Sequence, residues 1–205
     1  MKAVMISIQP KWCELIASGK KTIEVRKTRP KIDTPFKCYI YCTKAKSKEE
    51  RLILQPFGYE LGGLESNLTY RGDGKVIGEF VCDRISEYFY YKLYEELFDE
   101  SIGCFVDLFV YDLPYGELEQ TCLSYEEIEK YGNTNTLYGW HISDLVIYDK
   151  PRKIGEFYGY KKCNSCMSGY ESSACIFDED CKVPYTITRP PQSWQYVEEK
   201  ENYDE

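Results

Sequence analysis

Hydrophobic and polar positions alternate along much of the chain with the period of β-strands. The opening run, residues 2–8, reads KAVMISI, which has the length and the apolar content of a strand. Similar patterns predict further strands at residues 22–27, 36–44, 75–85, 139–151 and 190–199. Gly78 interrupts one of these strands and indicates a bulge or the close approach of another segment.

The first predicted helix covers residues 9–19. Pro10 suits the first helical position, apolar side chains recur at helical spacing, and Gly19 is typical of the position just after the last turn. The helix therefore connects the first two strands.

A second helix is expected at residues 123–132, where Ser124 and Glu127 have the spacing of a capping box and Gly132 would end the helix. The acidic and aromatic stretch before it, residues 87–120, contains EYFYYKLYEELF, a pattern that fits a helix or a strand. Many strands with two or three short helices predict an α+β fold, in which a small, partly closed β-barrel is flanked by helices.

The composition is that of a folded domain, because 43% of the 205 residues are hydrophobic and 16% are aromatic. The sequence shows neither the apolar core of a signal peptide nor the roughly 18 consecutive apolar residues of a membrane span. We therefore expect a cytoplasmic protein without a membrane partner.

The formal net charge of −8 is unevenly distributed. Residues 1–50 contain 12 Lys and Arg against 5 Asp and Glu, so the acidic excess lies in the rest of the chain. A basic segment in an acidic protein is typical of an anionic partner. Lysines scattered over a surface produce the same asymmetry, so charge alone leaves both interpretations open.

Much of this positive charge lies in the stretch GKKTIEVRK, residues 19–27. In a strand, Thr22, Glu24 and Arg26 point to one side while the apolar residues between them point to the core. The polar side is either an exposed face of paired charges or the lining of a binding cleft.

The same stretch resembles a known family. Gly19, Lys21, Glu24 and Arg26 fill the G-x-K-x-x-E-x-R signature of ASCH domains, which are related to PUA domains. The stretches GKVIGEF and YGWHISDLVIYDKP are also similar to ASCH strands, so the resemblance covers about residues 1–155 together with 185–199. It implies a PUA-like β-barrel that recognises RNA, nucleotides or modified bases in a cleft lined by the signature.

The resemblance implies that a ligand contacts the signature segment and the aromatic residues near it. Stacking on bases is a role for tryptophan and tyrosine rings, although each such ring is also a natural core residue. His141, which is the only histidine, fits a packing role and a ligand contact equally well. The candidate ligand-binding residues are Trp12, Gly19, Lys20, Lys21, Thr22, Glu24, Arg26, Tyr138, Trp140 and His141.

A second hypothesis is an amidohydrolase. Some bacterial ASCH proteins remove the acetyl group from N4-acetylcytidine, and this chain is similar to them at Lys21 and Glu79. Cations beside Lys21 would favour the neutral amine, which can act as a base or nucleophile, and Glu79 could then move the proton. Those hydrolases have a threonine where Glu24 stands here. The catalytic candidates are thus Lys21, Glu24 and Glu79.

A third hypothesis is a protein-interaction module that uses the acidic, aromatic residues 87–120. The chain has no phosphate-binding loop of the P-loop type, so nucleotide hydrolysis by that mechanism is excluded.

Four cysteines lie between two of the family strands, with the spacing C-x2-C-x8-C-x5-C. Four thiolates from a polar loop predict a tetrahedral structural zinc site, because such a loop buries too little apolar surface to order itself. Two disulfides or free thiols are the alternatives. The predicted zinc ligands are Cys163, Cys166, Cys175 and Cys181. The expected organisation is a barrel at residues 1–160, a zinc loop at 161–184, a closing segment at 185–199 and a charged tail at 200–205.

Overall fold

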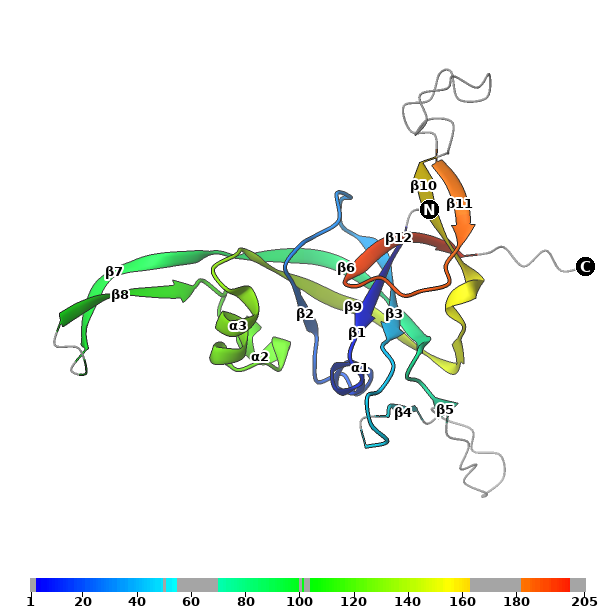
Figure 1. Ribbon diagram of the computed structural model, residues 1–205, viewed down its shortest axis with the longest axis horizontal. Coiled ribbons are helices and arrows are strands. Elements are labelled where there is room, and N and C mark those ends of the chain that lie inside the picture. Colours follow the sequence, from blue (N-terminus) through cyan, green and yellow to red (C-terminus); the bar gives the residue numbers. More distant parts are fainter. Residues whose placement is uncertain are drawn as a thin grey trace, which may run out of the picture. The chain divides into compact units, whose positions relative to one another are not determined.

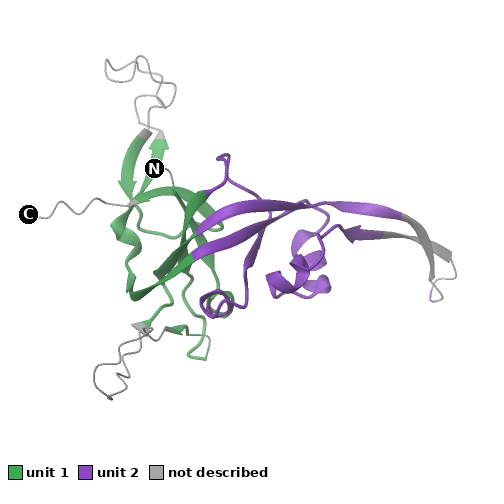
Figure 2. Cartoon of the chain, turned by 180° about the vertical axis from the view of Figure 1, so that it is seen from behind, with its two compact units in different colours: residues 1–13, 36–80, 145–205 green, residues 14–35, 81–144 purple. Residues whose placement is uncertain are grey.

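The chain is divided into two compact units (Figure 2). The computed structural model describes residues 3–49, 51–54, 70–99, 101, 104–162 and 182–199. Unit 1 comprises residues 1–13, 36–80 and 145–205, and unit 2 comprises residues 14–35 and 81–144. Neither unit is continuous in sequence, and boundaries between them fall within one helix and two strands, which therefore contribute residues to both units.

An eight-stranded mixed sheet forms the framework, with the strand order β11-β10-β12-β1-β3-β6-β9-β2 (Figure 1). β1 and β3 run parallel, whereas β1 pairs antiparallel with β12 and β2 with β9. The bounds of these strands are Ala3–Ile8 (β1), Ile23–Arg26 (β2), Phe36–Cys42 (β3), Lys75–Tyr88 (β6), Leu137–Arg152 (β9), Phe157–Lys162 (β10), Lys182–Thr186 (β11) and Trp194–Glu199 (β12).

This sheet is open, which corrects the prediction of a barrel. β11 and β2 stand at the two ends of the strand order and do not pair with each other. Closure of a barrel requires the two edge strands to pair. The alternation of side chains predicts which faces are buried, but it carries no information about which edges meet. The fold is therefore α+β with a dominant mixed sheet and few helices.

The remaining elements are short, except for one hairpin. A two-stranded sheet of β7 and β8 follows β6, and β4 pairs with β5. Their bounds, with those of the helices, are Pro10–Ala17 (α1), Ile53–Leu54 (β4), Tyr70–Arg71 (β5), Tyr90–Asp99 (β7), Cys104–Tyr111 (β8), Glu117–Thr121 (α2), Tyr125–Gly132 (α3) and Ile154–Glu156 (the 3-10 helix η1).

Unit 1 has its core on the β1–β3 part of the sheet. Every residue of β1 is buried. In β3, residues that point to both faces of the sheet are buried, because Tyr39 and Tyr41 are nearly as enclosed as the two cysteines and the isoleucine that alternate with them. The ring of Tyr39 lies 4.9 Å from that of Phe157. Both faces of these strands are therefore covered. The cluster contains Ala3, Met5, Tyr39, Tyr41, Val76, Phe157, Ile187 and Val197.

Unit 2 has a separate core cluster, composed of Val25, Tyr88, Tyr111, Ile128 and Leu137. These residues come from β2, the end of β6, the end of β8, α3 and the start of β9, so the short helices pack on the base of the hairpin.

The predicted strands and both predicted helices are present, with one difference in detail at the end of α3. Ser124 and Glu127 form the complete capping box of α3. Gly132, however, is the last helical residue, and the left-handed C-cap is Asn133, with φ 49°. Gly132 instead makes room for Tyr111, whose hydroxyl oxygen would lie 1.9 Å from an added Cβ. The ambiguous stretch before α3 is the hairpin followed by α2.

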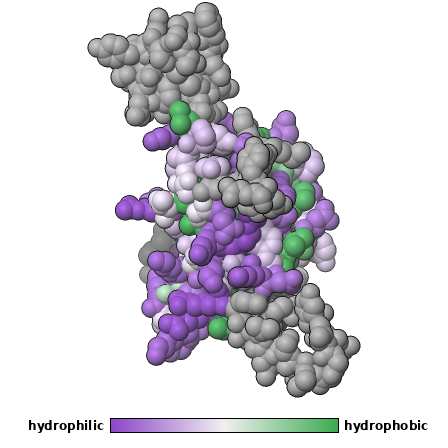
Figure 3. All heavy atoms as spheres, turned by 90° about the vertical axis from the view of Figure 1, so that its right-hand side faces the viewer, coloured by the Kyte–Doolittle hydropathy of each residue, from purple (hydrophilic) through white to green (hydrophobic). Residues whose placement is uncertain are grey.

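Two further observations concern the surface. No helix in the described ranges is both long and apolar enough to cross a membrane. On the face shown in Figure 3, hydrophobic residues stand singly among hydrophilic ones.

Candidate functional site

The signature segment begins with a helix end that its glycine makes possible. Gly19 has φ +72°. Its N–H donates to the carbonyl of Ile16, and the next N–H, that of Lys20, donates to the carbonyl of Leu15. These two bonds are those of a Schellman motif, which requires a left-handed residue and therefore favours glycine. The motif turns the chain so that Lys21 follows directly.

Lys21, Glu24 and Arg26 form a buried group that we call the charged trio. Glu24 Oε2 lies 3.4 Å from Lys21 Nζ, and Glu24 Oε1 lies 3.0 Å from Arg26 Nη2. Lys21 Nζ also donates to the backbone carbonyl of Thr121, at 2.6 Å. Only 2% of Lys21, 7% of Glu24 and 8% of Arg26 is exposed. One carboxylate therefore holds two buried cations of unit 2.

The pairing of β2 with β9 sets the surroundings of this trio. Glu24 lies directly opposite Trp140, and Arg26 directly opposite Tyr138. Directly opposed residues of an antiparallel pair share one face. Trp140 has no exposed surface and packs as a core residue, whereas Tyr138 is half-buried. The trio thus has one buried and one accessible aromatic neighbour.

His141 lies on the opposite face of the same strand pair, because it is opposed to Ile23. There it joins a second polar group, centred on Glu117 at the start of α2. Glu117 is 3% exposed and accepts hydrogen bonds from Ser86 Oγ, at 2.9 Å, and from Tyr88 OH, at 2.8 Å. Arg84 Nη2 and His141 Nε2 each lie 3.3 Å from Glu117 Oε1. We call this group, which consists of Glu117, Ser86, Tyr88, Arg84 and His141, the Glu117 cluster.

The contacts of His141 decide its protonation. Arg84 offers only donors, so Nδ1 of His141 accepts from Arg84 Nη2, at 3.2 Å, and we assign the ring proton to Nε2. That proton faces Ser86 Oγ, at 2.8 Å, while Ser86 donates to Glu117. Burial, and then the charge of Arg84, lower the pKa of His141. Ser86 Oγ therefore accepts a hydrogen bond from the ring N–H, whereas an activated serine nucleophile donates its proton to the ring.

Glu79 and Trp12 belong to unit 1. Glu79 accepts from Lys37 Nζ at 2.8 Å and from Tyr148 OH at 2.6 Å. Burial alone would raise the pKa of Glu79, but these two donors and the charges of Lys37 and Arg152 lower it overall. Glu79 is thus a carboxylate already bound by two donors. Lys11 Nζ lies 4.3 Å from the ring centroid of Trp12.

The other predicted residues flank the trio. Lys20 is exposed, and its backbone carbonyl accepts from Cys122 Sγ at 3.4 Å. The hydroxyl of Thr22 donates to the side chain of Gln120, at 3.3 Å. Both contacts fasten the signature segment to α2 and to the residue after it. The four predicted zinc ligands, Cys163, Cys166, Cys175 and Cys181, lie outside the described residues.

Sequence reasoning missed Thr121 and, apart from His141, the whole Glu117 cluster. One signal was available, since Arg84, Ser86 and Tyr88 recur at every second position and would share a face if the strand continued to residue 88. Glu117 gave no such signal, because it lies in a generally acidic region and its partners come from distant strands.

Comparison with known proteins identifies the family. Residues 6–203 match the family described as the ASCH domain. The chain belongs to this family. Among solved structures, this ASCH chain is similar to the crystal structure of ASCH from Zymomonas mobilis, with 15% identity and a TM-score of 0.45, over 96% of this chain and 87% of that chain. A Tyr-to-Phe variant of the Zymomonas protein gives 15% identity and a TM-score of 0.45, over 97% and 91%. None of the curated proteins matches this chain.

Proposed function

We propose that this ASCH domain binds RNA or a nucleotide-like ligand through its signature segment. The family supports the proposal, and the charged trio is the observation that carries it. Two cations and one carboxylate give the trio a formal charge of +1 in an otherwise acidic protein. Positive charge concentrated in the signature segment attracts an anionic ligand.

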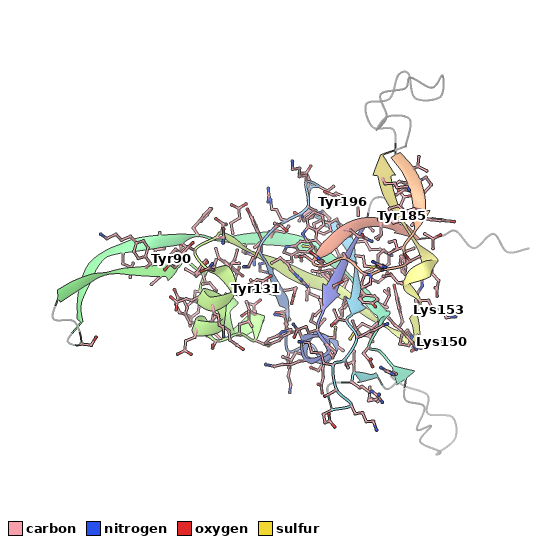
Figure 4. All side chains as sticks on the ribbon, in the orientation of Figure 1. Tyr90, Tyr131, Lys150, Lys153, Tyr185 and Tyr196 are labelled. Atoms are coloured by element: carbon pink, nitrogen blue, oxygen red, sulfur yellow. The ribbon has the colours of Figure 1, made fainter. Side chains whose placement is uncertain are left out.

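The surroundings of the trio suit this role. Lys20 and Lys27, which flank it in the sequence, are both exposed. Lys27 Nζ lies 5.2 Å from the ring centroid of Tyr131 on α3 (Figure 4). Exposed lysines beside aromatic rings are the combination that contacts phosphates and bases of single-stranded RNA. The acidic remainder of the chain would discourage indiscriminate binding of polyanions.

Binding is proposed ahead of amide hydrolysis because of the bonds that Lys21 makes. A neutral amine needed for attack would lose the charge attraction of Glu24 and would donate a weaker hydrogen bond to Thr121. Ser86 and His141 are likewise not arranged as a nucleophile and base. Chromatographic turnover of N4-acetylcytidine, with Lys21→Ala as the control, tests this second candidate function; cleavage lost in the variant would establish hydrolysis.

The proposed binding is tested with a fluorescein-labelled, twelve-nucleotide single-stranded RNA of mixed sequence, and with nucleoside monophosphates as competitors. The variant Lys20→Ala/Lys27→Ala removes two exposed cations of unit 2. We expect at least a tenfold loss of RNA affinity and a weaker dependence on salt, because fewer counterions are released.

The matched control is Lys150→Ala/Lys153→Ala, which removes two exposed cations of unit 1 (Figure 4). We expect less than a twofold change. Equal losses in the two double variants would mean that only net charge matters, and absence of RNA and nucleotide binding would refute the proposal.

We also propose that the four-cysteine segment binds one structural zinc ion. β10 and β11 pair antiparallel, and their register ends with Lys162 opposite Lys182. The residues that flank the cysteine segment therefore lie next to each other, and four thiolates are the ligand set of a tetrahedral zinc site.

A further inference from the structure

Aromatic residues are exposed on one face of the β7–β8 hairpin. Phe89 is 52% exposed and Tyr91 is 42% exposed. Asp112 N–H donates to the carbonyl of Phe89, and Tyr91 lies opposite Val110. The register therefore brings Phe89, Tyr91, Val110 and Asp112 onto one face of the hairpin. We call these four residues the outer strip.

The opposite face explains why the strip is left uncovered. Tyr90 and Tyr111 are directly opposed there, with ring centroids 5.0 Å apart, and both pack in the core cluster of unit 2 (Figure 4). Phe109 stacks on Tyr90 at 5.5 Å and 13°. One face of the hairpin base is thus used by the fold. The outer strip is the other face, and α3 packs on the side away from it.

The charge around the strip indicates what it binds. β7 and β8 contain four acidic residues and a single lysine. Glu87, two residues before Phe89, is exposed. Asp112, within the strip, is exposed. Phosphate groups are repelled by such a surface, whereas cationic side chains are attracted to it.

The chain itself provides an example of this recognition. Glu87 lies two residues before Phe89 and binds Arg29 of the same unit, with Nη1 3.6 Å from Oε1. A carboxylate that neighbours the strip in sequence thus already pairs with an arginine. Guanidinium groups also bind favourably over the faces of tyrosine and phenylalanine rings.

We propose that the outer strip binds an extended, arginine- and lysine-rich segment of a partner protein. Cationic side chains of that segment would lie over Phe89 and Tyr91 and pair with Asp112, while its backbone runs along the hairpin. In the described part of the chain, β7 and β8 pair only with each other, so each has an edge that an extended segment can join. This role is separate from the proposed binding of RNA and does not depend on it.

A labelled twelve-residue peptide of alternating arginine and alanine tests the proposal by fluorescence anisotropy at physiological salt. We expect Tyr91→Ala and Asp112→Asn each to weaken binding at least fivefold. Tyr115→Ala is the matched control, since Tyr115 is a fully exposed tyrosine of the same unit outside the strip, and we expect it to change affinity less than twofold. All four positions of the strip are at the surface or half-buried, so thermal unfolding should be unchanged.

Three results would overturn the proposal. The first is absence of peptide binding, and the second is an equal effect of Tyr91→Ala and Tyr115→Ala. The third is a loss of RNA binding, instead of peptide binding, in Tyr91→Ala, which would assign the strip to nucleic acid.

Discussion

Individual carboxylates determine how unit 2 holds its buried polar residues. Glu24 binds two cations, and Glu117 binds two hydroxyl groups, an arginine and a histidine. Removing either carboxylate would take a charge-assisted interaction away from its buried partners, which is costly. The spacing of the signature was enough to predict Glu24 from sequence. Glu117 was not predictable, because its role depends on contacts between segments 30 or so residues apart, which no local pattern encodes.

His141 makes the stability of the protein depend on pH. Its pKa in the folded protein is lowered below 6.5, mainly by burial and also by Arg84. Well above pH 6.5 the ring is neutral in both states and contributes no pH dependence. As the pH falls below 6.5, the unfolded state takes up the proton first, so the free energy of unfolding decreases, by up to ~1.4 kcal/mol per pH unit.

Urea unfolding between pH 5.0 and 7.5 measures this slope. His141→Gln should remove it, whatever its effect on stability at pH 7. Asp73, Glu79 and Glu156, whose pKa values are lowered, lose their contributions only below about pH 4.5, outside this range. If the free energy of unfolding depended on pH equally in His141→Gln and in the original protein, His141 would not be the source of the slope.

At the scale of secondary-structure elements, the sequence predicted the close packing at Gly78 of β6 but left the conformation of β7 open. The close approach expected at Gly78 is present in β6, since an added Cβ would lie 2.3 Å from the carbonyl oxygen of Val146. The strands and helices with clear periodicity were also found correctly. The stretch that became β7 was ambiguous because its apolar residues fit both periods, and pairing with β8, further along the chain, decided the outcome.

Gly78→Ala should therefore destabilise unit 1. The new methyl group would meet backbone atoms of β9, which cannot move without disturbing the sheet, so we expect a loss of about 1–3 kcal/mol and several degrees in Tm. Gly155→Ala is the control, because its nearest neighbouring atom lies 3.9 Å from the added Cβ and only a small change is expected. Equal melting temperatures for the two variants would show that β9 yields to the added group.

At the scale of the whole molecule, the family and the mixed α+β class followed from sequence, whereas the open sheet did not. Local alternation predicted the strands, but pairing between the edges of a sheet is decided by the whole chain. The division into two units was equally hidden, because three of its four boundaries fall inside α1, β6 and β9, where the local pattern is uninterrupted.

The proposed metal site predicts how much zinc each chain binds. Native mass spectrometry should find one zinc ion per chain, and Cys163→Ser/Cys166→Ser should abolish its binding, because two of four ligands are lost. Cys122→Ser, at a half-buried cysteine of unit 2, should keep the metal. Full stability of the metal-free protein would contradict a structural role.

The pairing of β1 with β12 has a consequence for biosynthesis. Ala3 lies opposite Val197, so one edge of β1 stays open after its synthesis until β12 has also been translated. At typical rates of synthesis this interval is roughly 10–40 s. During it, an apolar strand with an unpaired edge is available to other nascent chains. Holding chaperones should therefore matter more for the yield of this protein than its modest size suggests.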